Sequence, residues 1–538
     1  MKDGAGLEDA YGATLDRIKA QGEEKAKLAM ATLTWVCHSE RPLKVDELCH
    51  ALAVEIGATD FDCENIPLIS TLLDCCQGLI TIDKEALTVR LIHFTVQEYL
   101  CAHPDLPRKP QSMLAETCLT YLNSQLFKDF SSHSLPNHQS VPFLKYSSRY
   151  WGTHANRDLS DHARVLALEL LSQYEDHVSA VSLLKQVLRP EFIGDTSASL
   201  LFTGLHCASF FGIVELVTTL INAGGFEVNQ QDRVGGTPLS WAAANGHEEV
   251  VKMLLKRDDV DPNRSGAGKP TPLGWAAAKG QEGVVKLLLG WGSVDPNRPH
   301  KTGMTPLAFA AATGHEGMVR LLLERGDVDP NCPDEENVTP LARAVILGYD
   351  GVVKLLLEQE SVDPNIPDKD GLTPLACAVV KGREEMAKLL LGRGDIDPSL
   401  PDKDGLTPLA CAAAKGLEEV VKLLLVRGDV DPSLPDKDGL TPLTYAAAKG
   451  HEGVVELLLG WENVDPNHPE KGGLTPLACA ALQGHEGVVK LLLGRENVDP
   501  SFPDKNGLTP LDYAVVLGYD SLVKTLLGQE DADPSRPN

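Results

Sequence analysis

A Thr-Pro pair recurs nine times between residues 237 and 510, each pair 34 residues after the one before. The Thr residues are Thr237, Thr271, Thr305, Thr339, Thr373, Thr407, Thr441, Thr475 and Thr509. One step earlier, Thr203 keeps the pattern with Gly204 in place of Pro. A fixed period of this size is typical of a stacked array of small units, each of which buries its apolar face against its neighbours. Such arrays present long surfaces and seldom enclose an active site.

One unit, residues 407–440, shows how each copy should fold. The Thr407 hydroxyl is suited to cap a helix, and Pro408 is favoured at the first helical position. A Gly follows eight residues after the Pro in nine copies and at the same place in the tenth, from Gly212 to Gly518. This column predicts a left-handed backbone position that ends the first helix. An apolar second helix and an extended loop rich in Asp, Pro and Gly complete the unit.

These units resemble ankyrin repeats. The signature residues are Thr305-Pro306-Leu307, Ala310-Ala311, Gly314-His315 and Leu321-Leu322, and ten copies follow in register over residues 203–534. The resemblance implies a mainly α fold, an ankyrin solenoid of about ten units with a non-enzymatic, protein-binding role. Two features depart from the family. The His that usually follows Thr-Pro-Leu is kept only as His206, so its hydrogen bond between repeats should be absent elsewhere, and the period is one residue longer than the family's usual 33.

When the Thr that starts each copy is counted as position 1, the residues at positions 5 and 9 of the first helix point away from its Leu and Ala face. The resemblance places these two columns, with the hairpin tips, in the concave groove of the array. The predicted partner-binding residues are Trp241, Trp275, Lys279, Phe309, Arg343, Lys381, Lys415, Tyr445, Lys449 and Tyr513. Aromatic side chains and Arg are common anchors at protein interfaces. An alternative stays open, in which the fifth column packs between repeats and the Lys column is a solvated face.

Three patterns imitate ligand sites. Residues 265–269 look like a phosphate-binding loop, but Pro270 replaces the Ser or Thr that such a loop needs. Residues 436–439 and their copies evoke a calcium loop but lack its closing Glu, and are more simply hairpin turns. His315 and its equivalents recur once per unit and never cluster with Cys. We therefore expect no catalytic residue, no cofactor and no metal.

Bulk composition narrows the partners further. The formal net charge is -27, which opposes binding to nucleic acid and to anionic membrane surfaces. The N-terminus lacks an apolar signal segment, and no stretch of about 18 apolar residues occurs. The twelve Cys show no zinc-type spacing. These observations predict a cytoplasmic protein whose partner is another protein.

The first hundred residues follow a different plan. Residues 23–38, a segment starting at Val45 and residues 66–76 are predicted helices, and residues 79–82 and 89–92 alternate like two short strands. Three helices followed by a hairpin form a winged-helix arrangement. The third helix has no basic residue, whereas reading DNA requires them, so DNA binding is not expected.

This segment resembles the winged-helix region that follows the nucleotide-binding module of fungal NACHT-type, NOD-like receptors, which are STAND ATPases. The residues that carry the resemblance are Leu7-Glu8-Asp9-Ala10-Tyr11, Arg41-Pro42-Leu43, Cys76-Gln77-Gly78-Leu79 and Ile92-His93-Phe94-Thr95-Val96-Gln97-Glu98-Tyr99-Leu100. In that family the His can contact the phosphates of bound ADP. His93 would inherit this role only with a NACHT module upstream or in trans, because no Walker Lys precedes it and the chain starts where that module would end. Otherwise His93 packs at the wing.

The predicted organisation has five parts. They are an N-terminal helix remnant (1–22), a winged-helix-like domain (23–103), a linker (104–112), a helical spacer packed on the first repeat (113–200) and the ankyrin array (201–538). The favoured function is a protein-interaction module of a fungal NOD-like-receptor-type protein, possible partners including a NACHT ATPase module. The alternatives are a C-terminal fragment or truncated gene model of a NACHT-type ATPase or GTPase signalling receptor, and a general ankyrin scaffold.

Overall fold

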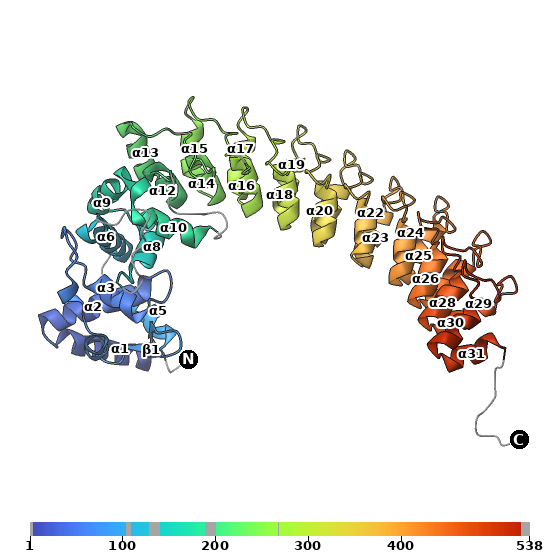
Figure 1. The fold of residues 1–538 in the computed structure, drawn as a ribbon. Helices are drawn as coiled ribbons and strands as arrows, with labels where there is room; N and C mark the ends of the chain where they lie inside the picture. The colour runs from blue at the N-terminus through green and yellow to red at the C-terminus, as the bar shows by residue number, and fades with distance from the viewer. Residues whose placement is uncertain (1–3, 104–108, 129–139, 189–200, 267, 529–538) are drawn as a thin grey trace, which may run out of the picture. The chain divides into compact units, whose positions relative to one another are not determined.

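The computed structural model describes residues 4–103, 109–128, 140–188, 201–266 and 268–528 (Figure 1). It divides into two compact units, residues 1–294 and 295–538. Unit 1 holds the N-terminal domains and the first three repeats, and unit 2 holds the following seven. Each unit is described by itself.

The N-terminal part of unit 1 is a bundle of helices with one β-hairpin. Its elements are α1 (Gly4–Lys19), α2 (Glu23–His38), α3 (Val45–Leu52), the 3-10 turn η1 (Cys63–Asn65), α4 (Ile69–Cys75), β1 (Ile80–Asp83), β2 (Thr88–Leu91) and α5 (Phe94–Ala102). The two strands are antiparallel, with Ile80 opposite Leu91. Leu33, Leu48 and Leu72, one from each of α2, α3 and α4, are fully buried. This is the predicted three-helix and hairpin arrangement of a winged helix.

A second group of helices follows. They are α6 (Pro110–Asn123), α7 (Gln125–Lys128), α8 (Leu144–Arg157), α9 (Asp161–Ser172), the 3-10 turn η2 (Tyr174–Asp176) and α10 (Val178–Val187). Residues 104–108 of the predicted linker lie outside the described residues, as do 129–139 and 189–200 of the predicted spacer. Helix α6 starts at Pro110, inside the range predicted as the linker. A Pro suits the first turn of a helix as well as a linker, and the sequence pattern alone did not separate the two.

An aromatic cluster joins the winged-helix domain to these helices. The Trp35 ring lies edge-on to Phe143 and Tyr146, with centroids 5.5 and 5.8 Å away. The backbone N–H of Glu40 donates to the Tyr146 hydroxyl at 3.0 Å. Because Trp35, Phe143 and Tyr146 are all buried, the two regions share one core.

The same helices cover the first repeat. Trp151 of α8 packs edge-on against Phe211, with ring centroids 5.1 Å apart. The end of α9 comes so close to Gly204 that a Cβ there would stand 2.1 Å from the Leu171 carbonyl oxygen. The first copy therefore carries Gly where the other nine carry Pro, since no larger residue fits under α9.

Each repeat is a pair of antiparallel helices followed by a loop. In unit 1 the pairs are α12 (Gly204–Phe211) with α13 (Val214–Ala223), α14 (Pro238–Ala244) with α15 (Glu248–Leu255), and α16 (Pro272–Lys279) with α17 (Glu282–Leu289). In unit 2 they are α18 (Pro306–Thr313) with α19 (Glu316–Leu323), α20 (Pro340–Leu347) with α21 (Asp350–Leu357), α22 (Pro374–Val380) with α23 (Glu384–Leu391), α24 (Pro408–Lys415) with α25 (Glu418–Val426), α26 (Pro442–Lys449) with α27 (Glu452–Leu459), α28 (Pro476–Gln483) with α29 (Glu486–Leu493), and α30 (Pro510–Leu517) with α31 (Asp520–Leu526). Within each unit, first helices pack on first helices and second helices on second helices, which makes two layers (Figure 1).

Both predicted helix signals are confirmed. In the nine Thr-Pro copies the Thr hydroxyl accepts the backbone N–H three residues later, as Thr407 does from Ala410 at 3.2 Å. All ten column glycines have φ between 68° and 86°. At Gly416 a Cβ would also lie 2.6 Å from the His451 ring of the next repeat. The glycine is thus required both by its backbone conformation and by the close approach of the neighbouring repeat.

Asparagine side chains tie the loops of successive repeats together. Asn365 donates from Nδ2 to the Asp395 carbonyl at 2.7 Å, and its Oδ1 accepts the Asp397 N–H at 2.8 Å. Asn297, Asn331 and Asn467 make the same two bonds in unit 2, and Asn229 makes them in unit 1. This Asn ladder supplies bonds between repeats where most copies lack the family's His.

The Asn ladder is interrupted twice in unit 2. Ser399 and Ser433 stand at the Asn position, and their hydroxyls bind the carboxylates of Asp397 and Asp431, two residues before them. Within the described residues neither Ser reaches the next repeat. The joints that follow these two copies therefore have fewer bonds than their neighbours.

We expect Asn365→Ser to destabilise unit 2 by roughly 1–2 kcal/mol, because two hydrogen bonds between repeats are lost and each contributes about 1 kcal/mol. The reverse change, Ser399→Asn, should extend the ladder and stabilise the protein. Urea unfolding measures the change in the free energy of unfolding. Amide hydrogen exchange at Asp397 and Asp431 shows whether the change is confined to the joint that each Asn bridges. Faster exchange spread over all repeats in Asn365→Ser would contradict a local bridge.

Candidate partner-binding face

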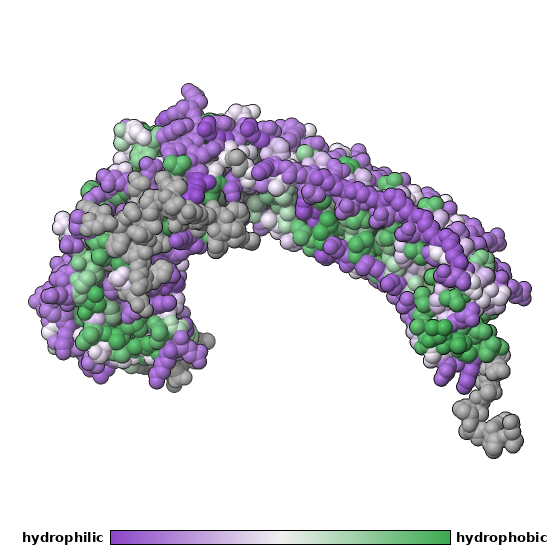
Figure 2. All heavy atoms as spheres, in the orientation of Figure 1, coloured by the Kyte–Doolittle hydropathy of each residue, from purple (hydrophilic) through white to green (hydrophobic). Residues whose placement is uncertain are grey.

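The ninth position of the first helices is exposed in both units. In unit 1 it holds Asn245 and Lys279, and in unit 2 it holds Thr313, Leu347, Lys381, Lys415, Lys449, Gln483 and Leu517. The first repeat is the exception, because Trp151 buries Phe211. Figure 2 shows hydrophobic residues gathered along the first-helix face of unit 2, whereas hydrophilic residues dominate the loops. On the first helices, this column therefore offers side chains that a partner can reach.

The fifth position has a different environment. Four of its side chains bind an acid nine residues earlier, at the start of the hairpin that precedes the helix. Trp241 donates from Nε1 to Asp232 at 2.7 Å, Tyr445 donates from its hydroxyl to Asp436 at 2.6 Å, Tyr513 donates to Asp504 at 2.7 Å, and Arg343 pairs with Asp334. These bonds hold the first helix against the hairpin that precedes it.

Burial decides which fifth-position residues remain available to a partner. Trp241 is 9% exposed, so little of this predicted binding residue is available to a partner. The predicted binding residues Trp275, Phe309, Arg343, Tyr445 and Tyr513 are only partly buried. The alternative of packing between repeats thus describes Trp241, because its indole fills the space between the helix and its hairpin.

Cys377, Cys411 and Cys479 occupy the same column and are buried. Burial is the main cause that raises the pKa of each thiol to about 12, with nearby carboxylates adding to it. A thiol with such a pKa stays protonated near neutral pH and is a poor nucleophile. These cysteines are packing residues.

A cavity of about 350 Å³ opens beside Trp241 in unit 1. Trp275, Lys269, Lys279 and Leu188 also line it. Sequence reasoning named both Trp and Lys279 but missed Leu188 and Lys269. Leu188 follows α10 and stands 53 residues before Trp241 in the sequence, and no local pattern in the sequence indicates that the two line one cavity.

Asp232, which accepts the indole N–H of Trp241, is buried. Burial is the main cause that raises the pKa of Asp232 to about 6, while hydrogen bonds from Trp241 and from the Gly236 backbone act in the opposite direction. Trp241 therefore stabilises the ionised form of the Asp232 carboxylate, against the effect of burial.

The histidines that follow the column glycine serve the stacking of repeats. His451 and His485 donate from Nε2 to the Ala414 and Ala448 carbonyls of the preceding repeat, at 3.1 and 3.2 Å. In unit 1, His247 does the same with Phe210 at 2.8 Å. Each His stands just before a second helix, as the sequence predicts for these residues.

The Asp-rich loops are hairpin turns, as predicted. Asp436 Oδ1 accepts the backbone N–H groups of Asp438 and Leu440, each at 2.9 Å. Successive hairpins are joined by backbone bonds such as Lys437 N–H to the Asp404 carbonyl at 2.8 Å. The phosphate-like segment also belongs to a hairpin, where the Gly266 N–H donates to the Gly235 carbonyl at 2.9 Å.

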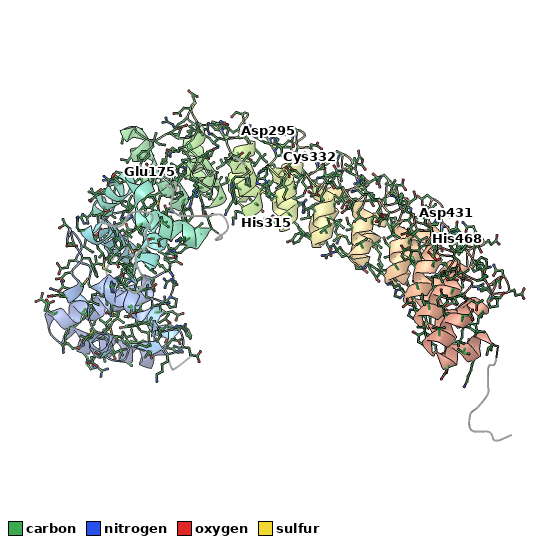
Figure 3. All side chains as sticks on the ribbon, viewed as in Figure 1. Glu175, Asp295, His315, Cys332, Asp431 and His468 are labelled. Carbon is green, nitrogen blue, oxygen red and sulfur yellow. The ribbon has the colours of Figure 1, made fainter. Side chains whose placement is uncertain are left out.

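The acids and histidines of the loops are spread along the array. Figure 3 shows Asp431 and His468 in separate loops between helix pairs of unit 2. Across the described ranges no group of three or more His, Cys, Asp or Glu side chains is arranged to hold a metal ion. Within those same ranges, no helix has the length and apolar character needed to cross a bilayer.

His93 is an exposed capping residue at the start of α5. Its Nδ1 accepts the Thr95 backbone N–H at 3.3 Å and lies 2.8 Å from the Thr95 hydroxyl. The ring also contacts the exposed Phe94, with centroids 4.4 Å apart. The expectation of a His packed at the wing is therefore corrected: His93 caps a helix from the surface, because its ring replaces a short N-cap side chain.

Comparison with known families accounts for most of the chain. The model described as "Ankyrin repeats (3 copies)" matches overlapping segments at 172–266, 205–300, 273–368, 327–402, 350–436, 394–470 and 453–538. The model described as "GPI inositol-deacylase, winged helix domain" matches residues 15–109. The protein belongs to the ankyrin-repeat family and carries this winged-helix domain at its N-terminal end. Ankyrin repeats are a fold of protein interaction and not of catalysis.

One curated relative is the "Azaphilone pigments biosynthesis cluster protein L" of Monascus ruber. It is 27% identical to this chain over 246 residues, which is 40% of this chain. The match spans 52% of the relative, so the chain covers about half the length of that protein.

We expect Trp241→Ala to destabilise unit 1 by about 3–5 kcal/mol, as for other large buried aromatics. Lys279→Ala should change stability by less than about 0.5 kcal/mol, because its side chain is exposed. Urea unfolding followed by circular dichroism measures both changes. Equal losses in the two variants would contradict the division into a packing column and an exposed column.

Proposed function

We propose that this protein is a non-enzymatic interaction module that binds a partner protein through the first-helix face of its ankyrin array. The observation that carries this proposal is the exposed ninth column. It supplies one side chain per repeat, each at the end of a capped first helix. Beside it, Trp275, Phe309, Tyr445 and Tyr513 offer partly exposed aromatic surface. Aromatic and basic side chains on a preformed surface suit a protein partner, because little side-chain order is lost on binding.

The N-terminal domain supports a second, compatible proposal about context. The winged-helix match over residues 15–109 and the exposed His93 favour a NACHT-associated, NOD-like-receptor-type protein in which the winged helix meets a nucleotide-binding module. The Monascus relative supports a fungal setting for proteins of this kind. A general ankyrin scaffold lacks this support, since it requires no winged-helix domain.

The two contexts can be separated by nucleotide binding. In the proposed arrangement the phosphate-binding residues belong to a separate module, so the chain by itself should not bind a fluorescent ADP analogue. Adding a NACHT module should create binding that His93→Ala weakens. Tight ADP binding by the chain alone would contradict the non-enzymatic proposal.

The binding face can be tested by photocrosslinking with the full chain. A benzoylphenylalanine placed at Thr313 or Gln483, in the ninth column, should yield the same adduct in an extract. The matched positions Arg320 and Lys490 lie on the second helices of the same two repeats and are also exposed. We expect no such adduct from them. Adducts only from the second helices would move the binding face to the other layer.

A further inference from the structure

The first helices of unit 2 are almost free of acidic residues. The one acid in these seven described helices is Asp512, in α30. By contrast, each second helix of unit 2 begins with Asp or Glu in its first turn. In unit 2, apart from Asp512, the acids therefore lie in the second-helix layer and in the loops.

Three consecutive repeats add positive charge to the acid-poor layer. Lys381, Lys415 and Lys449 occupy the ninth position in the copies that start at residues 373, 407 and 441, and all three are exposed. We call them the Lys strip. None of the three forms an ion pair with a described residue. On the second helices of the same region, Lys388 pairs with Glu385 at 2.8 Å and Lys422 with Glu419 at 2.7 Å.

Acids also occur in the hairpins that precede the three first helices of the Lys strip, at Asp368, Asp402 and Asp436. Asp368 raises and Lys381 lowers the pKa of the Cys377 thiol, and Asp402 and Lys415 act in the same two directions on the pKa of Cys411. Asp402 Oδ1 accepts the N–H groups of Asp404 and Leu406 at 2.9 Å, so this carboxylate is engaged in its own turn. The face thus has an acidic hairpin edge and a basic helix-end edge.

This division of charge favours a polypeptide over a nucleic acid. Every nucleotide carries a phosphate, so a strand lying across the face would bring negative charge against the hairpin acids as well. A peptide can direct its carboxylates to the Lys strip and present neutral residues to the hairpin edge.

The spacing of the repeats also constrains the peptide. Packed helices lie about 8–10 Å apart, so successive Lys side chains recur at about that interval. A polyproline II segment advances about 3.1 Å per residue and turns once every three residues. Carboxylates at every third position therefore lie on one face of such a segment, at the interval of the Lys strip.

We propose that the Lys strip binds an extended acidic segment of a partner protein, with Asp or Glu at every third residue. This inference rests on the proposed function, because it names the chemistry of the partner that the first-helix face receives. The attraction between exposed charges is modest per pair, so three pairs in register are needed and salt should weaken them.

The experiment uses the full chain and a fluorescein-labelled peptide of repeated Glu-Pro-Ser, measured by fluorescence anisotropy. The comparison peptides are Gln-Pro-Ser repeats and a peptide of equal composition with its Glu residues clustered. We expect the Glu-Pro-Ser peptide to bind at least about fivefold more tightly than the clustered one. Raising the salt from about 0.15 M to about 0.5 M should weaken it strongly.

The matched variants carry the same charge change on opposite layers. The triple variant Lys381→Gln, Lys415→Gln, Lys449→Gln should lower the affinity about tenfold, whereas Lys388→Gln, Lys422→Gln, Lys490→Gln should change it less than twofold. Unfolding curves of both triples should match the unmodified protein, since these side chains are on the surface. An equal loss of affinity in both triple variants would show that only the net charge of the protein matters, and would overturn the proposal.

Three other outcomes would also overturn the proposal, either by giving the Lys strip a different ligand or by showing that it does not bind the peptide. Tighter binding of a single-stranded RNA than of the peptide, lost in the first triple, would overturn the peptide in favour of nucleic acid. Salt-sensitive self-association, lost in the first triple, would make the occupant a second copy of this chain. No binding of the Glu-Pro-Ser peptide would refute the inference alone, because adducts from Thr313 and Gln483 would still support the proposed function.

Discussion

Contact between one helix pair and the next is the interaction on which the array depends. A single pair has two short helices and cannot enclose its Leu and Val side chains. Stacking buries them, as for Leu409, Val420 and Leu424, which are fully inaccessible to solvent. The close approach also explains the small residues of the first helices and the invariant glycine, since a side chain at Gly416 would collide with His451.

The polar bonds between repeats are built on this stacking and vary along the chain. The Asn ladder, the His column and the hairpin backbone bonds each join one repeat to the next. Ser399 and Ser433 remove one of these links at two neighbouring joints while leaving the apolar contact intact. Apolar stacking therefore sets the architecture, and the polar bonds adjust how firmly each joint is held.

The same geometry separates structural from available side chains on the first helices. The fifth position faces the preceding hairpin. In four copies its side chain bonds to the acid nine residues earlier, as Tyr445 does to Asp436. The ninth position lies at the helix end, beyond the reach of that hairpin, and remains exposed. A partner would meet the ninth column first and the rims of the aromatic residues beside it.

The sequence by itself determined the repeat unit, its caps and the left-handed glycines, because these depend on contacts within a few residues. It also determined the winged-helix elements and the identity of the ankyrin family, whose signature lies in short motifs. Only the tertiary structure decided that Trp241 is buried and that Leu188 lines the cavity beside Trp275. It also decided that no lysine of the Lys strip forms an ion pair with a described residue. These properties depend on how closely separate elements approach, and residue spacing within one repeat does not contain that distance.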